Sequence, residues 1–167
     1  MVSLDETVKE SRSQVENQYQ RRSDLIPNLV NTVQWFADQE ESVFVWVTEA
    51  RAKATQTTVD INDAESLTQF QQAQWELSSA LSRLLVAVEA YPDIKSNQNF
   101  LELQTQLEGT ENRISVERKR YNEIVKEYNT YIRKVPNNMF AKMFNFDPAT
   151  LFEAEEGAEE APEVNFE

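Results

Sequence analysis

Apolar side chains recur at alternating steps of three and four residues along three stretches of the chain, which begin at Ile26, Leu67 and Phe100. Seven of the eight positions on this pattern between residues 67 and 91 are apolar, as are nine of the eleven between residues 100 and 135. A repeat of about 3.5 residues is typical of helices that pack against one another at shallow angles. Because no alternating run bounded by a tight glycine turn occurs, the pattern predicts an all-α protein.

Prolines and capping residues divide this pattern into helices. Prolines stand at positions 27, 92, 136, 148 and 162, and the run from Asp60 to Asp63 offers Asn62 or Asp63 as an N-cap. We therefore predict an elongated antiparallel up-down bundle of four helices with a short C-terminal helix. The four helices are expected at roughly residues 4–22, 25–57, 63–91 and 93–135, and the short one near residues 138–146.

The boundary between the first two helices has two solutions. If residues 4–22 extended straight from the helix that follows them, they would project by about 30 Å, at about 1.5 Å per residue, without a partner in the chain. A turn at Ser23-Asp24 would let them fold back, and it would place Pro27 in a first helical turn, where proline is tolerated. We favour this turn, and one long helix kinked at Pro27 is the alternative.

Two charged residues interrupt the apolar stripes at what should be one height in the bundle. Counting outward from the turns near residue 60 and at Pro92 places Arg51 level with Glu117, and Gln74 level with Thr110. We predict that Arg51 and Glu117 form a polar layer inside the apolar seam. The favoured interpretation is an ion pair that fixes the register of the helices, and the other is a site for a ligand.

The composition excludes several functional classes. The chain has no cysteine, no histidine and only two glycines. It therefore lacks the residues of a thiol nucleophile, a Ser-His-Asp triad, a zinc finger and a glycine-rich phosphate loop. We expect no catalytic residues, no cofactor and no metal site. With 16 Lys and Arg residues against 29 Asp and Glu residues, the net charge of −13 argues against nucleic acid as a partner.

The charge is unevenly distributed along the chain. Eight acidic residues and no basic ones lie between Asp147 and Glu167, so the preceding part carries a net charge of only −5. We predict a helical bundle over residues 1–146 and an acidic, solvated C-terminal tail over residues 147–167. The sequence contains no run of about 18 apolar residues, so it predicts no membrane-spanning helix within this chain. The sequence turns acidic soon after Met1, unlike a signal peptide.

Several blocks of the sequence combine charged, proline and asparagine residues in a specific order. They are residues 18–30 (QYQRRSDLIPNLV), 49–51 (EAR), 91–104 (YPDIKSNQNFLELQ), 107–114 (LEGTENRI), 118–122 (RKRYN) and 128–129 (YN), with shorter matches at 136–137, 146, 152–153 and 164–166. Together the blocks closely resemble the signature of the bacterial LemA family over nearly the whole chain. The resemblance implies an antiparallel helical bundle, usually with one N-terminal membrane-spanning segment, and no established catalytic activity. Some members resemble proteins of magnetosome membranes, which suggests a role in membrane organisation.

The family motifs and the predicted polar layer together supply candidate structural or interaction residues. The resemblance assigns none of them a role. The candidates are Arg21, Arg22, Asp24, Asn28, Glu49, Arg51, Glu111, Arg113, Glu117, Arg118, Tyr121, Asn122 and Tyr128.

The resemblance and the missing catalytic chemistry favour a non-enzymatic helical module that is tethered to a bacterial cell membrane and binds or scaffolds an unidentified protein partner. The tether is expected to be a single-pass segment that is absent from this chain, and the side of the membrane stays open. The thin apolar stripe of residues 4–22 leaves room for self-association. The alternative is a small-ligand-binding protein or carboxylate-dependent enzyme that uses the layer around Arg51 and Glu117. A coiled-coil interaction protein with no membrane link is a weaker third hypothesis.

Overall fold

The computed structural model describes residues 1–37, 40–57, 59–60 and 62–153, and within them every regular element is a helix. The predicted all-α class is therefore confirmed. The helices are α1 (Val2–Gln34), α2 (Glu41–Gln56), α3 (Ala64–Val88), α4 (Pro92–Lys95), α5 (Gln98–Arg133) and α6 (Asn137–Met143).

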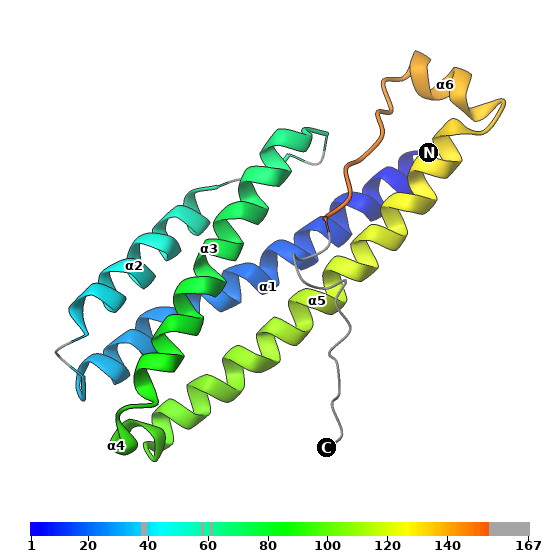
Figure 1. The fold of residues 1–167 in the computed structure, drawn as a ribbon. Coiled ribbons are helices and arrows are strands. Elements are labelled where there is room, and N and C mark those ends of the chain that lie inside the picture. The colour runs from blue at the N-terminus through cyan, green and yellow to red at the C-terminus, as the bar shows by residue number, and fades with distance from the viewer. Residues whose placement is uncertain (38–39, 58, 61, 154–167) are drawn as a thin grey trace, which may run out of the picture.

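The long helices form two antiparallel pairs of unequal length (Figure 1). α1 and α5, with 33 and 36 residues, pack mainly against each other, and α2 and α3, with 16 and 25, form a shorter pair beside one half of them. The start of α1 and the end of α5 therefore extend past this four-helix body as a two-helix stem. One buried apolar cluster fills the body, and a second runs from the start of α3 through the stem.

The predicted boundaries of the first two helices are wrong. α1 continues through Pro27 to Gln34, and the chain reverses between α1 and α2, so the turn is not at Ser23-Asp24 and the expected helix 25–57 is broken. The alternative of a helix that passes Pro27 holds as far as Gln34. The prediction failed because it gave residues 4–22 no partner. α5 is long enough to supply one, and fully buried Val8 and Val15 share a cluster with its C-terminal half.

The later helices lie close to their predicted positions. Asp63 caps α3, because its Oδ1 accepts a hydrogen bond from the backbone N of Glu65 at 3.0 Å. The expected helix 93–135 is divided into α4 and α5, since Asn97 caps a new helix by accepting from the backbone N of Phe100 at 3.1 Å. α6 begins one residue before the expected short helix and ends at Met143.

Residues 147–153, which we call the strap, run back along the stem without regular secondary structure (Figure 1). They were predicted to belong to a solvated tail, yet Ala149 and Phe152 are buried. The strap is thus an additional layer on the stem, and its end meets the start of α3, where Gln71 Nε2 donates to the O of Glu153 at 3.3 Å. Residues 154–167, the rest of the predicted tail, lie outside the described residues.

Two asparagines of α5 hold the strap by its backbone. Asn129 accepts from the N of Ala149 at 2.9 Å and donates to the O of the same residue at 2.8 Å. Asn122 makes the same pair of bonds with Phe152, at 2.9 and 3.0 Å. Because the two asparagines are seven residues apart, they lie on one face of α5. Their amide groups take the place of the neighbouring strand that an extended backbone otherwise needs.

Candidate functional site

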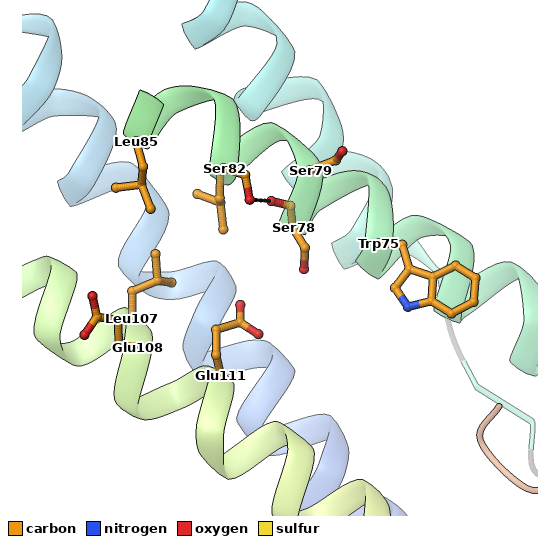
Figure 2. A pocket seen from close by; sticks show the side chains of 9 residues that line it. Trp75, Ser78, Ser79, Ser82, Leu85, Leu107, Glu108 and Glu111 are labelled. Atoms are coloured by element: carbon orange, nitrogen blue, oxygen red, sulfur yellow. Dashed lines mark hydrogen bonds between the residues drawn. The ribbon is translucent and has the colours of Figure 1, made fainter. Parts of the chain in front are cut away.

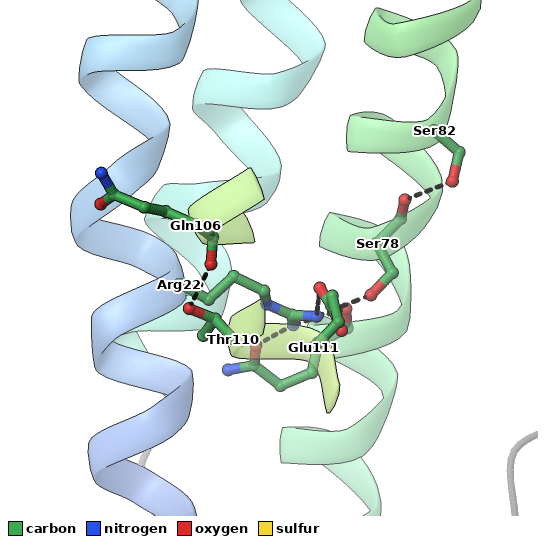
Figure 3. A network of polar contacts seen from close by, with 7 residues as sticks. Arg22, Ser78, Ser82, Gln106, Thr110 and Glu111 are labelled. Atoms are coloured by element: carbon green, nitrogen blue, oxygen red, sulfur yellow. Dashed lines mark hydrogen bonds and ion pairs between the residues drawn. The ribbon is translucent and has the colours of Figure 1, made fainter. Parts of the chain in front are cut away.

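Arg22 of α1 lies at the centre of a polar network in the body (Figure 3), and only 2% of its surface is exposed. Its Nη1 donates to Ser78 Oγ and to Glu111 Oε1, both at 2.8 Å. Its Nη2 donates to the side-chain Oε1 of Gln74 at 2.5 Å and to the backbone O of Gln74 at 3.2 Å. One guanidinium therefore joins α1 to both α3 and α5.

Aromatic side chains complete the surroundings of this cation. The guanidinium carbon of Arg22 lies 5.2 Å from the centre of the Tyr19 ring, and that ring meets Phe70 edge-on at 5.1 Å. Removing a guanidinium from water is costly unless acceptors and a counter-charge replace the lost solvent. Here four hydrogen bonds, one of them to the Glu111 carboxylate, and an aromatic face do so for the two Nη groups, while the buried Nε has no partner in the described structure. The network therefore discriminates strongly among alternative registers of the three helices.

The network is open to solvent at Glu111, whose side chain is 43% exposed. Glu111 lies on the edge of a groove of about 500 Å³ between α3 and α5 (Figure 2). The residues that line this groove are Trp75, Ser78, Ser79, Leu81, Ser82, Leu85, Leu107, Glu108 and Glu111. It offers hydroxyl and carboxylate acceptors in an apolar frame. Its lining residues include no lysine or histidine beside the serines.

A second contact explains how α1 continues through a proline. In a helix the N–H of residue 27 would bond to the carbonyl of residue 23, and Pro27 has no N–H. Ser23 is 2% exposed, so water cannot readily replace the missing donor. Arg51 of α2 supplies it, because its Nε donates to the O of Ser23 at 2.8 Å. Arg51 therefore stabilises the helix at the position where we had expected a turn.

The predicted pairing of Arg51 with Glu117 is wrong. Arg51 bonds to Ser23, and the nearest ion-pair partner that the described structure gives Glu117 is Arg120 on the next turn of α5, at 3.9 Å. The predicted alignment of α3 with α5, which placed Gln74 level with Thr110, agrees with the structure, since Gln74 and the neighbouring Glu111 both bond to Arg22.

The error lies in the connection between α2 and α3. Lys53 bonds to Glu76 at 2.6 Å, so α2 is displaced by several residues along α3 from the position that a tight turn would give. The connection itself runs toward the stem, where Arg12 of α1 donates to the O of Val59 at 3.3 Å.

The structure divides the sequence-predicted residues into three groups. Arg22 and Glu111 belong to the buried network, and Arg51 lies beside it. Four others contact the strap. The remainder, none of which enters the Arg22 network, consists of half-buried Glu117 and of exposed Arg21, Asp24, Asn28, Glu49 and Arg113.

The strap contacts come from α5 residues at successive turns. Tyr121 Oη donates to the O of Thr150 at 2.9 Å, and Tyr128 Oη donates to the O of Asp147 at 3.1 Å. Arg118 Nη2 donates to the O of Glu153 at 2.6 Å. Burial raises the pKa of Tyr121 to about 12 and also raises the pKa of Tyr128, so both hydroxyls stay donors at neutral pH.

The sequence analysis missed several residues of the Arg22 network and several that contact the strap. In the network it passed over Ser78, and on the strap it passed over Gln71 and Asn129 as candidates. The seven-residue spacing between Asn122 and Asn129 was a usable signal for a shared helix face. Ser78 and Gln71 carried no such signal, because a serine or glutamine in a helix is usually a surface residue.

Comparison with known proteins decides the family. The model of the LemA family matches residues 11–166. The chain belongs to the LemA family. Among curated LemA-like relatives, magnetosome proteins MamQ 1 and MamQ 2 of Paramagnetospirillum magneticum are each 28% identical to it over 171 residues, which cover 91% of this chain. Magnetosome protein MamQ of Magnetospirillum gryphiswaldense is 26% identical over 90% of this chain. The chain spans 62–63% of the length of these relatives.

The described residues of this LemA-family chain contain no group of three or more acidic side chains placed to hold a metal ion. None of the helices within the described ranges is both long and apolar enough to span a bilayer.

Proposed function

We propose that this LemA-family chain is a non-enzymatic interaction module that a single-pass N-terminal segment tethers to a bacterial cell membrane. The observation that carries the proposal is the position of the start of α1, at the free end of the stem and far from the four-helix body (Figure 1). A tether at that end would hold the body away from the bilayer. The groove at Glu111 would then be accessible to a protein partner.

The family and its relatives support the membrane part of this proposal. Curated relatives of similar sequence are named magnetosome proteins. The composition supports the non-enzymatic part, since the chain has neither histidine nor cysteine. The alternative, an enzyme or ligand-binding protein built on Arg51 and Glu117, has no geometric basis because the two residues do not share a site. Self-association of the protein stays a prediction.

The tether is tested by fractionating cells that produce the full-length protein. We expect the full-length protein to stay in the membrane pellet after an alkaline carbonate wash, and we expect the chain of residues 1–167 to be released. Release of the full-length protein by the wash would contradict the tether.

The interaction site is tested by placing a photo-crosslinking amino acid in the groove at Ser82 of the full-length protein, in native membranes. The matched control carries the same amino acid at Asn28, which is exposed on α1. We expect a discrete protein adduct from position 82 and none from position 28. Identical adduct patterns from both positions would contradict the groove as a docking site.

A further inference from the structure

α6 presents its largest apolar side chains to solvent. Met139 is 69% exposed, Phe140 49%, Met143 63% and Phe144 62%, and Val135 just before the helix is 80% exposed. Residues at positions i, i+1, i+4 and i+5 lie on one face of a helix. A short helix at the end of a bundle is expected to bury such a face as a cap. In this protein the apolar face points outward.

The orientation of α6 is fixed by the way it ends. Asn145 adopts a left-handed conformation with φ 55°, and the N of Phe146 bonds to the O of Ala141 at 2.9 Å. This is the Schellman arrangement of a helix C-terminus. Ala141, on the side of the helix away from the exposed face, is buried in the core of the stem, and Phe146 packs against the same cluster. The exposed face therefore cannot turn inward without losing this packing.

Basic residues flank the exposed face in the sequence. Residues 128–146 contain Arg133, Lys134 and Lys142 and no acidic residue, in a chain whose net charge is −13. At the start of α1, on the same end of the stem, Asp5 and Glu6 are paired with Lys9. An exposed apolar face bordered by basic residues is complementary to the headgroup and upper acyl region of an anionic bilayer.

We propose that α6 and its basic flanks form a foot that contacts an anionic lipid surface. The foot comprises the apolar residues Val135, Met139, Phe140, Met143 and Phe144 and the basic residues Arg133, Lys134 and Lys142. The inference deepens the proposed function, on which it rests for the proximity of a membrane. The foot lies at the same end of the stem as the start of α1 (Figure 1). A tether there and the foot would together set the stem upright on the bilayer.

The experiment uses the chain of residues 1–167 and vesicles of defined composition. Because the chain has no cysteine, Met143→Cys gives a single site for an environment-sensitive fluorophore. The matched control is Val86→Cys on α3, a site that is 71% exposed and lies on the body. With vesicles of equal phosphatidylcholine and phosphatidylglycerol we expect a blue shift from the probe at position 143 and none at position 86. Added salt is expected to weaken binding, since it screens the lysines.

Three variants separate the apolar and the charged parts of the foot. Phe140→Ser with Phe144→Ser is expected to lower the apparent lipid affinity at least tenfold. Lys134→Gln and Lys142→Gln are each expected to lower it about fivefold on anionic vesicles. All four side chains are on the surface, and the helical circular dichroism of the variants should match that of the parent chain.

The possible results distinguish this inference from the tether. A probe at position 143 that does not shift at millimolar anionic lipid would overturn the foot, as would equal binding to pure phosphatidylcholine or a protein cross-link at this face in native membranes. Retention of the full-length protein in the carbonate-washed pellet would leave the tether standing in each case. A foot that binds vesicles, combined with a full-length protein that washes off, would instead refute the tether alone.

Discussion

The contact between Arg51 and the carbonyl of Ser23 predicts that the effect of an α2 mutation depends on a proline in α1. Arg51→Met keeps most of the side-chain volume and removes the donor, so the buried carbonyl of Ser23 loses its partner. Pro27→Ala restores the N–H that a helix would normally direct at the same carbonyl. The two substitutions should therefore not be additive.

The magnitude follows from the geometry. A hydrogen bond from a charged group at 2.8 Å to a buried acceptor contributes about 1.5–3 kcal/mol. When residue 27 is proline, Arg51→Met should lower the free energy of unfolding by about that much. When residue 27 is alanine, the same substitution should lower it by less than about 1 kcal/mol, because the helix itself then supplies a donor to the carbonyl of Ser23. The expected coupling free energy is therefore about 1–2 kcal/mol.

The assay is urea unfolding of the four proteins of the cycle, followed by helical circular dichroism, with equal m-values as the test that the unfolded states are comparable. Lys53→Met in the same two backgrounds is the matched control, since Lys53 bonds to Glu76 of α3 and should show no coupling to Pro27. If Arg51→Met costs the same in both backgrounds within about 0.3 kcal/mol, the donor role assigned to Arg51 is refuted.

Two further predictions concern the strap. Asn129→Ala removes both bonds to the backbone of Ala149 and should destabilise the fold by about 1–2 kcal/mol. It should also speed hydrogen exchange of the Ala149 amide at least tenfold, with no change in α3. Unchanged exchange of this amide would contradict the role assigned to Asn129 in holding the strap. Burial raises the pKa of Tyr121 to about 12, above the value of about 10 in the unfolded chain, so the resulting stability is present below pH 10 and is lost as the pH rises toward 12. The free energy of unfolding should fall by about 1.4 kcal/mol per pH unit in this window, and Tyr121→Phe should flatten that decline; equal slopes for both proteins would argue against it.

The position of the first turn shows where sequence reasoning stops. The apolar stripe passes from Val33 through Ala37 to Phe44 at helical spacing, and all three are buried. The same spacing is compatible with one straight helix or with two helices that reverse in between, since the stripe faces the core in both. The turn was decided by the length of α5, whose far end offers α1 a partner that only the tertiary structure reveals.

The candidate site divides in the same way. Arg22 and Glu111 were identified as candidates from local motifs, but their pairing joins residues 89 positions apart in sequence. The acidic composition of the last 21 residues predicts solvent exposure for a segment on average. It could not reveal that Ala149 and Phe152 would meet a row of asparagines and tyrosines on α5.

The sequence by itself determined the all-α class and the approximate course of α3 and α5, and it limited the cap of α3 to Asn62 or Asp63. Each of these depends on residues within about two helical turns of one another, where periodicity and capping act locally. Only the tertiary structure decided the path of α1 through Pro27, the burial of Arg22 and the docking of the strap. In each case a backbone or side-chain group that is costly to desolvate finds its partner on a distant segment. The register of the packed helices determines which groups meet, and no local sequence pattern predicts that register.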